Sequence, residues 1–165
     1  MIGKATLRYL DKTLESDLKA ELRAQGHYLT GELERSINST LQEIAGGESL
    51  EVTAADYIQQ LETGVPASQI RATPAYYAAI EKYVELRFGL FGAKAAHVAS
   101  LIVSKHKAHG MPTAESYAYS DTGHRTEVLE DTYNGHEDYY NQIVGDSLSY
   151  ELDQAIDQTF TITEF

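Results

Sequence analysis

The sequence predicts a small α+β domain, and three observations carry this prediction. Leucines recur at steps of three and four along residues 4–25, which is typical of an amphipathic helix. Two segments with alternating apolar and polar residues, 37–45 and 49–54, flank Gly46-Gly47 and predict an antiparallel β-hairpin. After the hairpin the apolar residues return to helical spacing. We therefore expect a small antiparallel sheet packed by a long N-terminal helix and by further helices.

The N-terminal helix is predicted to end at Gly26 and carries an apolar stripe along one face. The stripe consists of Leu7, Leu10, Leu14, Leu18 and Leu22. An isolated helix cannot bury such a stripe, so it needs either the sheet or another subunit to cover it. Leu7 and Leu14 are therefore candidates for contacts between subunits.

Two short signatures flank the hairpin. The first is Leu29-Thr30-Gly31-Glu32-Leu33-Glu34-Arg35-Ser36-Ile37, in which Thr30 is a candidate helix N-cap and Leu33 and Ile37 are apolar anchors. The second is Asp56-Tyr57-Ile58-Gln59-Gln60-Leu61-Glu62-Thr63-Gly64, a short helix that Gly64-Val65-Pro66 ends. We interpret the Thr-Gly pair as a structural cap and not as part of a catalytic site.

The rest of the chain is predicted to form loops and helices. A loop with two prolines spans 65–74, and helices of about 75–88 and 93–109 are separated by Gly89 and Gly92. The stretch 111–124 is irregular and rich in tyrosine. A helical stripe then runs from Tyr140 at steps of four, and the alternation from Thr159 to Phe165 predicts a C-terminal strand added to the hairpin.

Composition bounds the class of protein. With 165 residues the chain has the length of a single domain, which we assign as 1–165. It has no cysteine, which excludes disulfides and thiolate metal sites within the chain. No apolar run approaches the roughly 20 residues that span a bilayer, so we expect no membrane association.

The acidic charge is concentrated in a C-terminal region, 126–165. The formal net charge of the chain is −12, yet residues 126–165 contain ten acidic residues and no Lys or Arg. Two interpretations stay open. The region is either a solvated surface that aids solubility, or a face that repels nucleic acid.

Residues with catalytic potential are few. His106 and His109 are three apart near a predicted helix end, and with His124 and either Glu115 or Asp121 they could ligate zinc in a metal-dependent hydrolase. The chain has no His-Glu-x-x-His, no nucleophile elbow and no phosphate-binding glycine loop. The prediction is therefore a protein that is not an enzyme, with no catalytic residues, no cofactor and no metal, and the hydrolase is the weakest alternative.

The order and spacing of the two signatures around the hairpin resemble the tail-completion or head–tail joining family of long-tailed bacteriophages, some members of which are minor tail proteins. The resemblance covers roughly residues 1–120, although Tyr83 stands where the family commonly has Trp. The residues that carry the resemblance are Thr30, Gly31, Leu33, Ser36, Ile37, Tyr57, Leu61, Glu62 and Gly64.

The resemblance implies a structural virion protein, assembled in the host cytoplasm, whose copies form a ring in the neck. Its partners would be the portal or adaptor on one side and the tail tube or terminator protein on the other. Genomic DNA would pass through the channel without specific binding. The charge asymmetry adds the hypothesis that the acidic region 126–165 lines or rims this channel. Pro66, in a loop that contacts neighbours in the family, and Tyr117 and Tyr119 are further candidate subunit contacts.

A second interpretation comes from a different class. The acidic region also suits a small protein that mimics DNA and inhibits a nucleic-acid-binding enzyme. Steeply salt-dependent binding to a basic protein distinguishes this alternative from a ring component.

Overall fold

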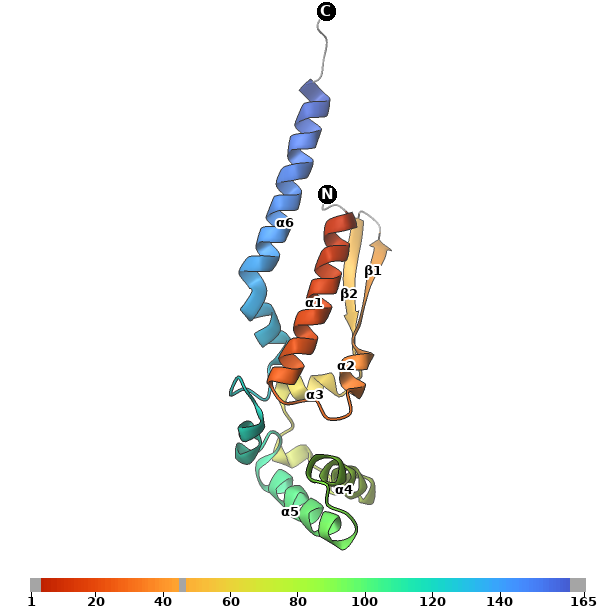
Figure 1. Ribbon diagram of the computed structural model, residues 1–165, viewed down its shortest axis with the longest axis vertical. Helices are drawn as coiled ribbons and strands as arrows, with labels where there is room; N and C mark the ends of the chain where they lie inside the picture. The colour runs from red at the N-terminus through yellow and green to blue at the C-terminus, as the bar shows by residue number, and fades with distance from the viewer. Residues whose placement is uncertain (1–3, 45–46, 161–165) are drawn as a thin grey trace, which may run out of the picture.

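The chain folds into an elongated α+β structure, which confirms the predicted fold class (Figure 1). The computed structural model describes residues 4–44 and 47–160. In chain order the elements are α1 (Lys4–Ala24), α2 (Glu32–Ser36), β1 (Asn38–Ile44), β2 (Gly47–Thr53), α3 (Ile58–Thr63), the 3₁₀ helix η1 (Ala67–Gln69), α4 (Pro74–Phe88), α5 (Ala93–His109), the 3₁₀ helix η2 (Ala114–Tyr119) and α6 (Val128–Phe160).

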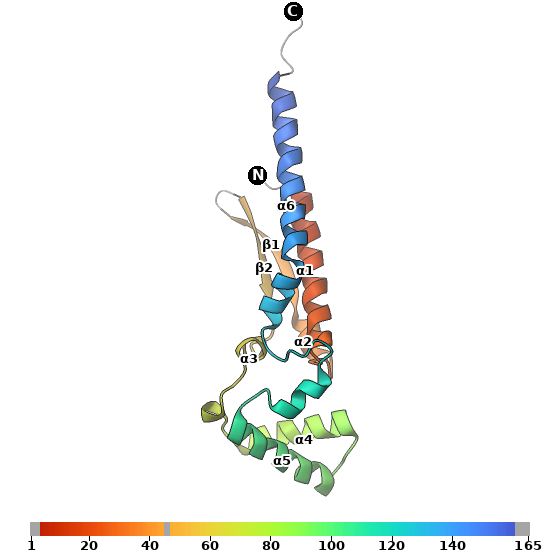
Figure 2. The ribbon, with the colours of Figure 1, turned by 90° about the vertical axis from the view of Figure 1, so that its left-hand side faces the viewer.

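The elements fall into two groups along the long axis. In the first, α1 contacts both the β-hairpin and α6, and α2 and α3 close the end of this group (Figures 1 and 2). In the second, α4 and α5 form a helical hairpin at the opposite end of the molecule from the C-terminal half of α6 (Figures 1 and 2). A short antiparallel bridge between Val65 and Met111 lies where the two groups meet.

Helix α1 forms where the leucine stripe predicted it, and the stripe is covered within the chain. Leu18 and Leu22 are buried in a core with Leu33, Ile37 and Val128, while Leu7 and Leu14 are half-buried. The helix ends because Gly26 has a φ of 73°, and a Cβ there would also collide with the carbonyl oxygen of Tyr119. A role for Leu7 and Leu14 in subunit contacts stays a prediction.

The predicted hairpin is present with a register that runs from Asn38 opposite Thr53 to Ile44 opposite Gly47. Leu50 and Val52 are half-buried and Glu51 is exposed, as the alternation predicted. Gly47 belongs to the strand, and Gly46 lies outside the described residues.

A third strand at the C-terminus is not part of the described sheet, which has two strands. The predicted strand began at Thr159, but Thr159 and Phe160 belong to α6, so the prediction is wrong for these two residues. The helical stripe from Tyr140 reaches as far as Phe160, and helix propagation along it overrides the short alternating pattern. Residues 161–165 lie outside the described part.

Helices α4 and α5 match their predicted bounds to within one residue. The hydroxyl of Thr73 accepts a hydrogen bond from the Tyr76 amide at 3.2 Å and caps α4. The two helices pack through Val84, Ala95 and Ala99, and the alanines let the helix backbones come close together.

Helix α6 packs against α1 over its first half and then continues past it (Figure 1). The hydroxyl of Tyr140 donates to Asp17 at 2.7 Å, and Thr6 bonds to Ser147 at 2.8 Å. No single helix among the described residues is long and apolar enough to cross a membrane; α4 and α5 pass that test of length and composition only as a pair, bent by 114°. A single domain spanning 1–165 stays a prediction.

Candidate functional site

The first signature forms the link between α1 and the hairpin. Leu33 and Ile37 are 4% and 3% exposed and pack against Leu18 and Leu22 of α1. The hydroxyl of Ser36 donates to the Leu33 carbonyl at 2.7 Å and accepts from the Ala55 amide at 3.0 Å. The signature therefore ties the start of β1 to the end of β2.

The Thr-Gly pair caps α2 in a different way from the prediction. The N-cap position belongs to Gly31, whose φ of 71° is in the left-handed region, and not to Thr30. Thr30 lies one residue earlier, where its hydroxyl accepts from the Glu32 amide at 3.3 Å. The predicted cap is displaced by one residue because a left-handed backbone favours glycine at that position.

The second signature holds the start of α6. The carboxylate of Glu62 accepts from the amides of Leu129 at 2.7 Å and Glu130 at 3.3 Å, and so satisfies two of the free donors in the first turn of α6. Leu61 packs on the same core as Leu33. Tyr57, at the start of α3, is 41% exposed.

Gly64 closes the second signature at a tight approach between two segments. Its φ is 69°, and a Cβ would lie 2.7 Å from the Met111 carbonyl oxygen. The amide of Val65 donates to that same oxygen at 2.7 Å, and the Met111 amide donates back to Val65 at 2.8 Å. The signature glycine is therefore explained by packing between the chain after α3 and the chain after α5.

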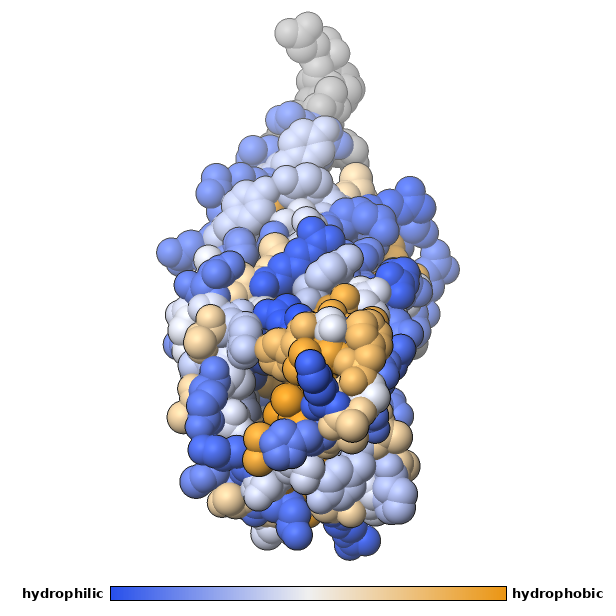
Figure 3. Space-filling model, turned by 60° about the horizontal axis from the view of Figure 1, so that its bottom comes forward, coloured by the Kyte–Doolittle hydropathy of each residue, from blue (hydrophilic) through white to orange (hydrophobic). Residues whose placement is uncertain are grey.

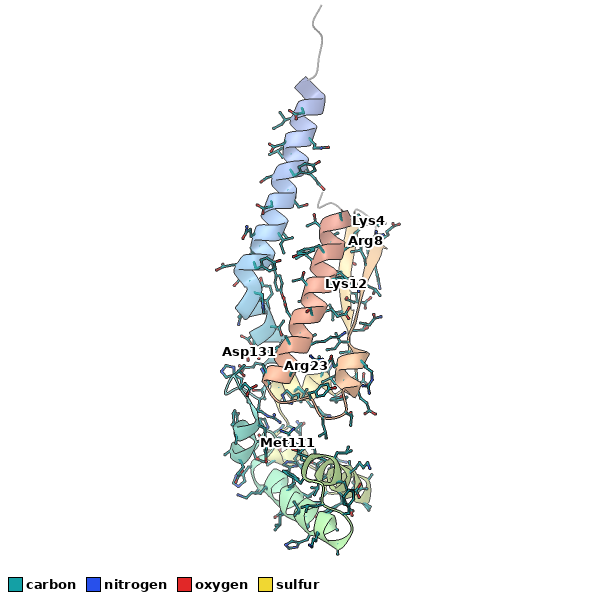
Figure 4. All side chains as sticks on the ribbon, in the orientation of Figure 1. Lys4, Arg8, Lys12, Arg23, Met111 and Asp131 are labelled. Carbon is teal, nitrogen blue, oxygen red and sulfur yellow. The ribbon has the colours of Figure 1, made fainter. Side chains whose placement is uncertain are left out.

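A cluster of hydrogen-bonded polar groups, which we call the polar joint, connects the end of α1 to the start of α6. The fully buried side chain of Gln25 lies within hydrogen-bond distance of the Thr126 carbonyl and of Asp131, at 3.1 and 3.0 Å. Arg125 donates to the Gln25 carbonyl at 2.6 Å. Figure 4 labels Asp131 at the base of α6, beside the last turn of α1 that carries Arg23.

A groove lies between the two groups of elements. It consists of two adjacent hollows of about 240 and 390 Å³. Figure 3 brings the α4–α5 end of the molecule toward the viewer and shows apolar side chains gathered on that side. Both hollows share the side chains of His27, Tyr57, Tyr83, Tyr119 and Arg125.

The groove is lined by two arginines, Arg87 and Arg125, by the carboxylates Glu32, Glu34 and Glu115, and by several tyrosines. The Arg87 guanidinium stacks over the Tyr119 ring at 4.8 Å, and burial lowers the pKa of Arg125. Burial, together with the nearby Arg125 charge, lowers the pKa of His27 to about 4. His27 is therefore neutral near pH 7, and the groove offers arginine and phenol donors beside apolar walls.

The histidines of the hydrolase alternative have separate surroundings. His106 bonds the Tyr76 hydroxyl at 2.7 Å, and burial raises the pKa of Tyr76 and lowers that of His106, so the pair is uncharged at neutral pH. His109 is exposed at the end of α5, and His124 pairs with Asp131 at 2.7 Å, which raises the pKa of His124.

One group of potential metal ligands is present among the described residues. His124, Glu127 and Asp131 place one ligand atom each within 4.8 Å of one another, and His106 and His109 are not part of it. Two of the three side chains are exposed, and exposed carboxylates commonly gather without an ion. We therefore assign no metal to this group.

The remaining candidate contact residues lie on the surface. Pro66 is exposed beside η1, and Tyr117 and Tyr119 are each 41% exposed on η2. Sequence reasoning missed His27, Arg87 and Arg125 as groove residues. No local pattern marks them, because each belongs to a different segment and only the fold brings them together.

Comparison of this chain with family models, with curated proteins and with solved structures finds no match in any of the three.

Proposed function

We propose that the chain is a structural protein of the neck of a tailed bacteriophage, where its copies form a ring that completes the tail. The observation that carries the proposal is the pair of signatures, Thr30–Ile37 and Tyr57–Gly64, in their order around the hairpin. Their residues serve packing, capping and close approach, with Glu62 holding α6 and Ser36 holding the hairpin. Such roles suit an architectural protein.

The distribution of surface chemistry also supports a ring. A closed ring with one interface type needs two different patches on each copy. The elongated molecule carries an acidic helix toward one end and a helical hairpin with exposed apolar residues at the other (Figure 1). In the ring, the neighbours along the axis are the portal or adaptor and the tail tube or terminator protein.

The acidic helix α6 has a place in this proposal. Its 33 residues include eight acidic side chains and no Lys or Arg. Facing the channel, this helix would repel the DNA backbone and let the genome slide without sticking. Locating the acidic side chains on the outer wall of the ring would contradict this part of the proposal.

The experiment that tests the neck proposal is quantitative mass spectrometry of purified particles from the source phage. We expect the chain at a small, fixed copy number in a simple ratio to the portal protein. A chain that is abundant in infected cells but absent from particles would overturn the proposal.

The second candidate function is inhibition of a nucleic-acid-binding enzyme by an acidic mimic of DNA. The observation that favours it is the same helix α6, whose acidic residues extend from Glu130 to Asp157, over about 40 Å at 1.5 Å per residue. Its test is capture of a basic host protein at low salt that is lost as salt rises toward about 1 M.

A further inference from the structure

The C-terminal half of α6 leaves an apolar stripe uncovered. Up to Ser147 the helix is held against α1, where Thr6 bonds Ser147 at 2.8 Å. Beyond that point the stripe continues at steps of four through Leu148, Leu152 and Ile156, which are 44%, 61% and 44% exposed. We call residues 148–157 the α6 distal segment. Each step of four turns the stripe by about 40° around the helix, so along this segment it winds away from the side that α1 covers at Tyr140 and Ser147.

Acidic side chains flank this stripe. Successive residues of a helix are about 100° apart, so Glu151 and Asp153 lie on either side of Leu152. The α6 distal segment contains no Lys or Arg. A partner for this surface therefore has to combine apolar contact with positive charge.

The opposite end of the same molecule has this combination. We call α4, α5 and the turn between them the hairpin end. It exposes Leu86, Phe88, Phe91 and Leu101, and Phe91 is 69% exposed. Between Pro74 and His109 there are five Lys and Arg against two Glu. Lys94 lies seven residues before Leu101, so both share one face of α5.

One copy cannot bring these two surfaces together, because they lie at opposite ends of its long axis (Figures 1 and 2). We infer that the α6 distal segment of one copy binds the hairpin end of a second copy. Its apolar stripe lies against the exposed phenylalanines and leucines, and Asp153 lies near Lys94. The occupant of each surface is thus another copy of this chain. The inference rests on the proposed function for its ring, and adds which surfaces meet.

The interface joins two different patches, which makes it heterologous. Such an interface closes into a ring when the rotation per copy permits, and otherwise extends into a filament. A symmetric dimer through two α6 distal segments is disfavoured, because it would bring the acidic flanks of both helices together.

The absence of cysteine from the chain allows a direct test. Single variants Leu152→Cys and Leu101→Cys are prepared from the full chain, mixed and oxidised mildly at up to about 1 mM protein. We expect disulfides between the two different variants and few between identical copies. The matched control pairs Leu101→Cys with Thr40→Cys, an exposed position on the hairpin strand β1, and should give none. Crosslinking between identical Leu152→Cys chains, or none at all, would overturn the inference.

Charge reversal gives a second readout on the same full chain. Asp153→Lys is expected to weaken self-association, measured by sedimentation, by about tenfold, and Lys94→Glu on the same chain is expected to restore it. Circular dichroism checks that each variant keeps its helix content. Failure of the second change to restore association would contradict the inference.

The outcomes separate this inference from the neck proposal. Particles that contain the chain but yield no crosslink between the two ends would overturn the contact and leave the neck assignment intact. If the crosslinks form in solution but purified particles do not contain the chain, the contact between copies stands and the neck assignment is overturned.

Discussion

The two groups of elements bury their apolar residues in different ways. The core around α1 collects Leu18, Leu33 and Val128, and the first and last of these are more than 100 residues apart in the chain. The core of the α4–α5 hairpin collects Val84, Ala95 and Ala99 from two helices joined by a short turn. The first core depends on the whole chain, whereas the second depends on local contacts and small side chains. Long-range packing fixes the signatures in place, and the local hairpin leaves its larger apolar residues exposed.

This difference predicts different responses to mutation. A core assembled from distant segments unfolds as one unit, whereas a helical hairpin with a small core can open locally at lower free energy. The predictions below test that contrast, from the largest expected effect to the smallest.

Leu22→Ala should have the largest effect. Leu22 is 2% exposed in the long-range core, and its truncation should lower the free energy of unfolding by about 2–5 kcal/mol. The measurement is urea denaturation followed by circular dichroism. The control is Leu101→Ala, at a 56% exposed position, which should change stability by no more than about 0.5 kcal/mol.

Val84→Ala tests the same contrast in the core of the α4–α5 hairpin. Val84 is fully buried in the hairpin core, and loss of two methyl groups should cost about 2 kcal/mol. Hydrogen exchange should show faster exchange in α4 and α5 while α1 keeps its protection. Equal acceleration in α1 would show that the two cores unfold together.

His27 lies where the two groups meet, and it should make stability depend on pH. Burial, with the nearby Arg125 charge, lowers its pKa from 6.5 to about 4 in the folded chain. Between these values the unfolded chain binds more protons, so stability is full above pH 6.5 and falls as the pH drops toward 4. For this partly exposed ring the loss should be about 1–3 kcal/mol.

The matched variant for this effect is His27→Gln, which should flatten that part of the pH profile. His124 acts in the opposite direction, since Asp131 raises its pKa and its contribution is lost as the pH rises. Because both proteins retain His124, its contribution cancels in the difference. A profile that is unchanged by His27→Gln would contradict the assignment.

The elements that the sequence predicts well are those with local patterns. The leucine stripe defines α1, the diglycine between alternating segments defines the hairpin, and Gly89 and Gly92 separate α4 from α5. The polar joint between α1 and α6 was not predictable in this way. Gln25, Arg125 and Asp131 meet across about 100 residues of chain, and a single sequence has no pattern that records such pairing.

Two other features of the structure differ from what the sequence analysis predicts. The cap of α2 falls on Gly31 because the backbone there is left-handed. The exposed apolar turn Phe88-Gly89-Leu90-Phe91-Gly92 was visible in the sequence but was interpreted only as a helix break. Large apolar residues beside two glycines are the signal that could have indicated a contact surface.

Glu62→Gln should have a smaller effect than the core substitutions. The carboxylate caps the first turn of α6, and the neutral amide keeps one acceptor but loses the charge that favours a helix N-terminus. The expected loss is about 1 kcal/mol. Glu130→Gln is the control, since it removes the same charge from an exposed residue of that turn. Equal losses of stability in both variants would show that Glu62 stabilises α6 only through its negative charge and not through its hydrogen bonds to the first turn.

Arg23→Gln should have the smallest effect, although Arg23 makes a two-point ion pair with Glu34. Its Nε and Nη2 donate to both carboxylate oxygens of Glu34 at 2.9 and 2.6 Å, which links α1 to α2. The Arg23 side chain is 60% exposed, so water and salt screen the pair and the core beneath it already fixes the two helices. Arg8→Gln, on the same helix, removes an equal charge from another exposed residue (Figure 4). At low salt Arg23→Gln should be slightly less stable than Arg8→Gln, and at about 1 M salt the two should agree. A difference that persists at high salt would mean that this pair, and not only the leucine core, holds the first signature to α1.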